Sequence, residues 1–144
     1  MTTVRWEFPC DLASPARARR LVRELLADRP YAHALGDDAE LLVSEVVANV
    51  VRHAGTEAQL TVRVGAHGLR VEVEDHSPRL PTIPCSFTDG DPDLREAGRG
   101  LALVETVAQA WGVERSGDGK VVWFELMDPD DRVDARDRFA YTAG

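Results

Sequence analysis

The chain has 144 residues, of which 44% are hydrophobic and 29% charged, a balance typical of one globular domain. Its 25 acidic and 17 basic residues give a net charge of −8, which argues against nucleic acid as the main partner, because phosphate binding depends on Lys and Arg. No stretch approaches the roughly 18 apolar residues of a membrane span, and no signal-like segment opens the chain. We therefore expect a cytoplasmic protein with no membrane partner.

The N-terminal segment predicts a strand followed by a helix. Residues 4–8 alternate apolar and polar side chains, the period of a strand with one buried face. Ser14 and Pro15 then combine an N-cap hydroxyl with a proline suited to the first helical turn. The apolar spacing that follows predicts a helix over about residues 15–28.

A second helix contains the first candidate functional residues. We expect it to open at residues 36–38, where acidic side chains complement the helix dipole, and to end near Gly55. Glu45 and Asn49 interrupt its apolar run at i, i+4 spacing, so they share one face a turn apart, and His53 follows one turn later. Buried polar groups are costly without partners, so this pair is a candidate site rather than an exposed face.

The rest of the chain predicts two hairpins around a further helix. Residues 60–73 alternate on both sides of a turn, and the second hairpin falls within residues 111–127. The Pro-rich and acidic stretch 75–98 is long for a connector, which predicts a functional lid. A short helix is expected over 101–107, and the charged tail 128–144 is expected to be mobile.

Two more elements can contact a ligand. Asp75 ends a predicted strand, where a carboxylate can accept a hydrogen bond from an amino group. Gly98, Arg99, Gly100 and Leu101 begin a helix, where backbone N–H groups can approach phosphate. Each element taken alone is also common in ordinary turns.

In this order, the elements resemble the ATP-binding domain of the gyrase, Hsp90, histidine-kinase and MutL superfamily, especially its small anti-sigma-factor serine/threonine kinase branch. The motifs are Glu45-x3-Asn49-x3-His53-Ala54, Val71-x-Val73-x-Asp75, Gly98-Arg99-Gly100-Leu101 and Gly119-Lys120-Val121-Val122-Trp123. The resemblance implies an α+β fold, a two-layer sandwich of mixed, mostly antiparallel sheet against about three helices. It also implies an ATP-binding domain over 1–127, with 128–144 as a tail.

The resemblance assigns roles to these residues. Asn49 would hold Mg²⁺ against the phosphates of ATP, Glu45 would accept the proton of the attacking hydroxyl, and Asp75 would receive the adenine amino group. His53 would be structural and would hold the end of its helix by a hydrogen bond. Gly98, Arg99, Gly100 and Leu101 would wrap the phosphates, with Arg99 stabilising the charge that develops during transfer.

The chain departs from the superfamily pattern at two places. Ser77 stands where a glycine is usual in the adenine-binding loop, and Val121 and Val122 occupy the stretch where many members place a threonine near adenine. Lys120 is expected to be solvated on its hairpin turn, although it could reach phosphate.

The function implied is an ATP-dependent serine/threonine protein kinase of the partner-switching type. It would act as an anti-sigma factor and phosphorylate an anti-sigma-factor antagonist, with a sigma factor as a second partner and a homodimer left open. The alternative is a non-catalytic module that binds a nucleotide or a partner. A zinc site is rejected because the four histidines have no ligand spacing, and Cys10 and Cys85 are expected to be reduced thiols.

Overall fold

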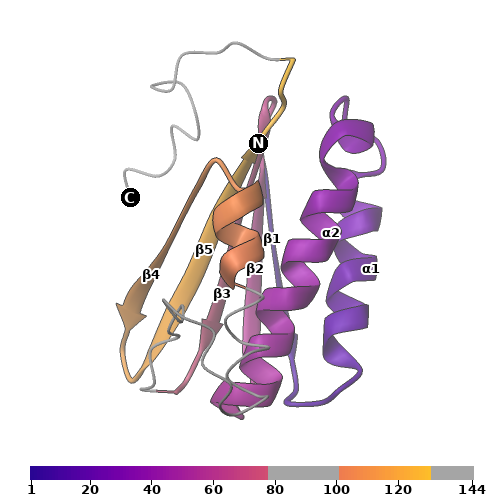
Figure 1. Cartoon of the computed structure of the whole chain (residues 1–144). Helices are drawn as coiled ribbons and strands as arrows, with labels where there is room; N and C mark the ends of the chain where they lie inside the picture. The colour runs from indigo at the N-terminus through magenta and orange to yellow at the C-terminus, as the bar shows by residue number, and fades with distance from the viewer. Residues whose placement is uncertain (78–100, 131–144) are drawn as a thin grey trace.

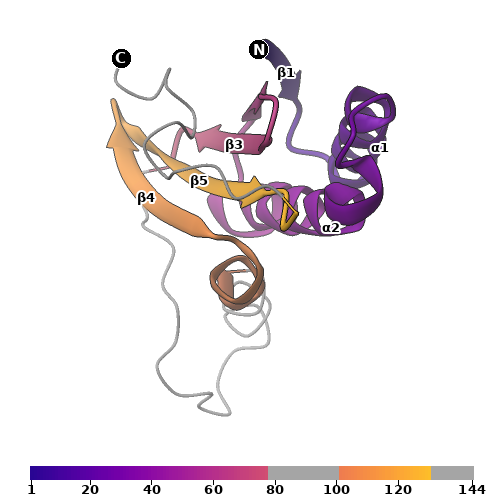
Figure 2. The same cartoon turned by 90° about the horizontal axis from the view of Figure 1, so that it is seen from above.

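The structure, a computed structural model, describes residues 1–77 and 101–130. Its five-stranded sheet has the order β1-β2-β3-β5-β4, and every pair of neighbouring strands is antiparallel. Helices cover one face of this sheet, as Figures 1 and 2 show. The predicted α+β sandwich is therefore confirmed, with a sheet that is antiparallel throughout rather than mixed.

The N-terminal elements follow the expected order with shifted ends. They are β1 (Thr2–Phe8), α1 (Ser14–Leu26), α2 (Ala32–Asn49) and a π-helical turn, η1 (Val50–Ala54). Ser14 is not the N-cap that was predicted: Ala13 holds that position, and the Ser14 hydroxyl donates to the carbonyl of Pro9 at 2.8 Å. The predicted start of α2 was also wrong, because the helix already begins at Ala32 and its first turn has no acidic residue.

The two predicted hairpins and the helix between them are confirmed. The strands are β2 (Ala58–Val64), β3 (Gly68–Asp75), β4 (Ala110–Ser116) and β5 (Gly119–Met127), and residues 101–107 are helical. Gly117 has a φ of 56° in the second turn, a conformation that glycine adopts readily. Residues 78–98 of the expected lid and residues 131–144 of the expected tail lie outside the described residues.

One apolar core fills the space between the sheet and the helices. The buried core side chains come from α1, α2, helix 101–107 and the helix-facing side of the strands, and include Val22, Leu42, Val46, Leu60, Val71, Leu101 and Phe124. Burying a Val, Leu or Phe side chain contributes about 1.5–3 kcal/mol relative to leaving it exposed. Within the described part of the chain, no helix is long and apolar enough to cross a membrane.

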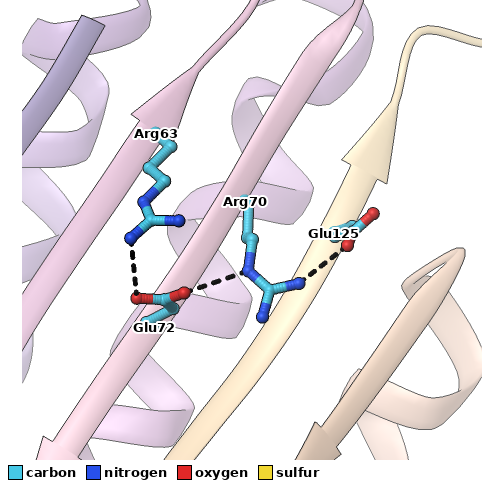
Figure 3. Close-up of polar contacts among 4 residues, drawn as sticks. All are labelled: Arg63, Arg70, Glu72 and Glu125. Carbon is cyan, nitrogen blue, oxygen red and sulfur yellow. Dashed lines mark hydrogen bonds and ion pairs between the residues drawn. The ribbon is translucent and has the colours of Figure 1, made fainter. Parts of the chain in front are cut away.

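The opposite face of the sheet carries charged side chains. Arg70 donates to Glu72 at 3.0 Å and to Glu125 at 2.8 Å, while Arg63 lies 3.8 Å from the other oxygen of Glu72 (Figure 3). The Arg70 guanidinium also lies 4.2 Å from the ring centroid of Trp123. These contacts join β2, β3 and β5, and they involve the alternate strand positions that point away from the core.

Several chain segments meet at one end of the sheet. Figure 1 shows the end of α2 and the end of β3 at the same end of the molecule. Gly55, in the left-handed region with a φ of 66°, donates its N–H to Val50 and ends η1 as predicted for the helix stop. The segment between η1 and β2 contacts the residue that follows β3, because the His76 N–H donates to the Thr56 hydroxyl at 3.1 Å. The fold thus places the end of α2 beside the end of β3.

Candidate functional site

Asp75 is a buried carboxylate at the end of β3. It continues the alternation of Val71 and Val73, so its side chain lies on the helix-facing side of the sheet, where it is 2% exposed. One carboxylate oxygen, Oδ1, accepts the backbone N–H of Ser77 at 2.9 Å. The other, Oδ2, lies 2.7 Å from the Lys120 Nζ. The carboxylate that the sequence assigns to adenine is therefore held by two donors of the chain itself.

Lys120 is the residue that sequence reasoning placed wrongly. It is 6% exposed rather than solvated, because the antiparallel register of β3 and β5 sets it directly opposite Asp75 on the same face. Gly119 makes this close approach possible, since a Cβ at that position would overlap the carbonyl oxygen of Asp75. The register of two strands far apart in sequence was the missing signal, and it is visible only once both strands are paired.

The two departures from the superfamily pattern have structural consequences. Ser77 is buried, and its backbone N–H fixes the Asp75 carboxylate. Val122 is a core residue, and its neighbour Val121 lies on the opposite side of β5. The polar group that the sheet places next to Asp75 is the ammonium of Lys120, in place of the threonine hydroxyl that the resemblance implies.

Glu45 and Asn49 occupy the last turns of α2. Both side chains are partly exposed, and neither makes a side-chain hydrogen bond among the described residues. Their spacing puts them on one face of the helix, at the end that meets β3 (Figure 1). A carboxylate and an amide oxygen without internal partners remain available to a ligand.

His53 does not do what was expected of it. Its Nε2 is buried and has no hydrogen-bond partner in the described part of the chain, so the predicted hydrogen bond at the helix end is wrong. The Gly55 N–H, which donates to the Val50 carbonyl at 2.8 Å, closes this end instead. The turn that carries His53 is π-helical, a geometry that often occurs at functional sites.

The predicted phosphate-binding residues are described only in part. Gly98, Arg99 and Gly100 lie outside the described residues. Leu101 is 1% exposed and belongs to the core, so its side chain anchors the start of helix 101–107. Only its backbone remains available for the predicted phosphate contact.

Metal binding is another role that the donors of this site could serve. Among the described residues, no group of three or more His, Cys, Asp or Glu side chains could hold a metal ion. The Asn49 amide oxygen suits Mg²⁺, which keeps several waters and takes further oxygens from substrate phosphates. A magnesium ion held jointly with a nucleotide fits this donor set.

Comparison with known proteins identifies the family. The histidine kinase-like ATPase domain family matches residues 8–126, so the chain belongs to this family. An uncharacterized protein of Streptomyces coelicolor, SCO4941, is 38% identical over 87 residues, which cover 56% of this chain and 76% of that protein. The predicted superfamily resemblance is therefore confirmed.

Two solved structures share the fold at low sequence identity. The structure of the RsbU and RsbW domains of Rv1364c from Mycobacterium tuberculosis matches 88% of this chain with a TM-score of 0.66 and 16% identity. This match spans about a third of that longer chain, 32% of its length. The SiaB–SiaC complex from Pseudomonas aeruginosa matches 85% of this chain and 88% of its own, with a TM-score of 0.59 and 14% identity.

Proposed function

We propose that this chain is an ATP-dependent serine/threonine protein kinase of the partner-switching type. One observation carries the proposal: in a member of the histidine kinase-like ATPase family, Glu45 and Asn49 end α2 at the same sheet end as Asp75. That arrangement can bind the adenine base and the phosphates and can accept the proton of the attacking hydroxyl in one reaction. The kinase acts in the cytoplasm, and its ATP-binding domain covers residues 1–127, with 128–144 as a tail.

The proposed binding roles follow the chemistry of each group. The Asn49 amide oxygen holds Mg²⁺, which neutralises phosphate charge when it is bound. Asp75 accepts the adenine amino group, with Ser77 positioning the carboxylate through its N–H. The backbone of residues 98–101 and the side chain of Arg99 contact the phosphates.

The proposed transfer step uses Glu45 as the base. Its carboxylate takes the proton of a Ser or Thr hydroxyl while that oxygen forms a bond to the γ-phosphorus. The bond from the γ-phosphorus to the bridging oxygen of ADP breaks, and ADP leaves. Arg99 stabilises the charge on the transferring phosphoryl group. The carboxylate is suited to this role because it is partly exposed and free of internal hydrogen bonds among the described residues.

A protein partner is the proposed phosphate acceptor. SiaB, which shares the fold, was crystallised in a complex with SiaC, and the RsbW domain of Rv1364c shares its chain with an RsbU domain. By analogy, we assign an anti-sigma-factor antagonist as the substrate and a sigma factor as the alternative partner.

The test begins with Asn49→Ala. In the parent, MgATP should raise the melting temperature more than ATP in EDTA, because a ligand of the folded state stabilises it. Asn49→Ala should lose the Mg²⁺-dependent part of this shift and remain folded. Ser44→Ala, which removes a hydroxyl bonded within the same helix, should keep the full shift. If Asn49→Ala responds to MgATP like the parent, Asn49 is not the metal ligand.

A second candidate function is a binding module without phosphotransfer. The observation that favours it is the engagement of Asp75 by Lys120 and Ser77, which leaves less of the carboxylate for adenine. Incubating the parent with γ-labelled ATP and candidate antagonists from the same genome separates the two functions. Tight partner binding with no label on any partner would favour the module and contradict the kinase.

A further inference from the structure

The contact between Asp75 and Lys120 places a donor beside an acceptor at the proposed base-binding end of the site. The two side chains lie opposite each other on β3 and β5, and 2.7 Å separates Oδ2 from Nζ. An ammonium has three N–H donors, and Asp75 is the one partner of Lys120 among the described residues. Two donors of a side chain that is 8% exposed therefore remain for a ligand.

The position of the pair is fixed by the backbone around it. The Ser77 N–H holds Oδ1 at 2.9 Å, and the strand carrying Lys120 packs against the Asp75 carbonyl where Gly119 has no side chain. A ligand would therefore meet the carboxylate and the ammonium together. Removing either charge would leave the other buried without its partner.

This pairing changes which purines can bind. A carboxylate alone accepts a hydrogen bond from the 6-amino group of adenine. It repels the 6-oxo group of guanine or hypoxanthine, because the carboxylate and the 6-oxo group are both acceptors. Beside an ammonium, the 6-oxo group gains a donor, and the adjacent N1–H can donate to the carboxylate. Adenine can use the same two protein groups with the roles exchanged. Its 6-amino group donates to the carboxylate, and its N1 accepts from the ammonium.

We propose that Lys120 determines base selectivity, and that this chain binds 6-oxopurine nucleoside triphosphates as well as ATP. The inference rests on the proposed function, because it requires Asp75 to face the base. Lys120 is a specificity residue under this proposal, and the phosphate contacts are common to all the nucleotides.

The experiment first measures dissociation constants of the unmodified chain for ATP, GTP and inosine triphosphate, each with Mg²⁺, by calorimetry. A good pair of base contacts is worth roughly tenfold or more in affinity, so a nucleotide that lost the pair would bind more weakly by at least that factor. GTP keeps both contacts under this proposal, so its dissociation constant should lie within about tenfold of the ATP constant. Inosine triphosphate should follow GTP, since it has the 6-oxo group and N1–H without a 2-amino group. A GTP constant more than tenfold above that of ATP would overturn the proposal.

The sequence offers a direct probe, because Lys120 is the only lysine. Protein labelled with ¹³C at the lysine Cε has one lysine signal in an NMR spectrum. That signal should shift on saturation with GTP, and also with ATP. An unmoved signal at saturating GTP would overturn the proposal, because the base would then bind away from Lys120.

Variants test the selectivity itself. Lys120→Met should raise the ratio of the GTP to the ATP dissociation constant at least tenfold, by removing the donor for the 6-oxo group. Arg115→Met is the matched control, since Arg115 is the exposed cross-strand neighbour of Lys120 on β4 and should leave the ratio unchanged. An unchanged ratio in folded Lys120→Met would overturn the proposal. If Lys120→Met does not fold, the ratio of the GTP to the ATP dissociation constant in the parent and the lysine NMR signal test the proposal.

The outcomes also separate this inference from the proposed function. A chain that binds ATP and transfers phosphate but rejects both 6-oxopurines contradicts the base selectivity alone. A chain that binds none of the three nucleotides contradicts both proposals.

Discussion

The two ends of the helix-covered sheet differ in how their polar groups are satisfied. At the end where β2 turns into β3, the Tyr31 hydroxyl lies 2.7 Å from the Gly65 carbonyl oxygen and 3.0 Å from that of Gly68. The Gly65 N–H donates to the Gly68 carbonyl, and the Asp128 N–H donates to His67. These groups find their partners within the chain, so this end is closed.

The opposite end keeps polar groups without internal partners. His53 Nε2 is buried without a hydrogen bond, and Glu45 and Asn49 make no side-chain hydrogen bond among the described residues. Lys120 has one partner there for three donors. Buried polar groups normally find partners, so the buried His53 and Lys120, together with the partly exposed Glu45 and Asn49, support the ligand site proposed at this end. The comparison teaches that polar groups at one end of the sheet stabilise the fold, while those at the other end are free for the binding role that we propose.

The largest expected effect belongs to Glu45. Glu45→Gln should lower phosphotransfer by roughly 10² to 10⁴, because the amide cannot accept the hydroxyl proton. The free energy of unfolding and the ATP affinity should stay close to those of the parent, since the side chain is partly exposed. The transfer of labelled phosphate to the antagonist measures the rate.

Glu24→Gln is the matched control, because Glu24 is an exposed carboxylate on α1. It should keep the parent's rate. Loss of ATP affinity in Glu45→Gln with an unchanged rate would instead identify Glu45 as a structural residue.

A smaller effect is expected at Gly119. Gly119→Ala should destabilise the protein by about 1–3 kcal/mol, because the added Cβ overlaps the Asp75 carbonyl and forces β5 away from β3. The same shift separates Lys120 from Asp75, so nucleotide affinity should also change. Urea unfolding followed by tryptophan fluorescence measures the stability.

Gly36→Ala provides the opposite control. A Cβ at Gly36, inside α2, meets nothing within 4 Å, and alanine is the better helix former. This variant should gain roughly 0.5–1 kcal/mol. Equal stability of the two alanine variants would contradict the packing assigned to Gly119.

The sequence predicted the fold well because its signals are local. Alternation located β1 and both hairpins, and helical spacing located α1 and α2. The start of α2 was missed because residues 32–35 lack a capping side chain, and Tyr31 makes no side-chain cap there. Packing of Leu35 in the core supports the extra turn, and tertiary packing of this kind is not visible in local spacing.

The candidate site was predicted in its residues and less completely in its contacts. The order of the motifs was enough to single out Asn49 and Asp75, and their roles remain predictions. The partner of Asp75 could not be predicted, because it depends on the register of β3 against β5, more than forty positions apart in the sequence. The π-helical turn at His53 gave no distinct sequence signal either.

A more modest effect than that at Gly119 is expected at the closed end, at Tyr31. Burial, the main cause, raises the pKa of this 1% exposed tyrosine from 10.0 to about 12. A raised tyrosine pKa favours the protonated, folded form, so this stability is complete below pH 10 and is lost as the pH rises from 10 to 12. The loss attributable to Tyr31 should reach about 1.4 kcal/mol at pH 11.

Tyr31→Phe isolates this contribution. At pH 8 the variant should be about 1 kcal/mol less stable than the parent, because it lacks the hydroxyl that bonds Gly65 and Gly68. The difference should vanish or change sign by pH 11, because ionisation of the tyrosine stabilises the unfolded parent by about 1.4 kcal/mol and phenylalanine has no proton to lose. Urea unfolding of both proteins at the two pH values measures it. MgATP affinity should be the same in both proteins, because the proposed binding groups lie at the other end. A stability difference that stays constant between pH 8 and 11 would show that Tyr31 is not held protonated by the closed end.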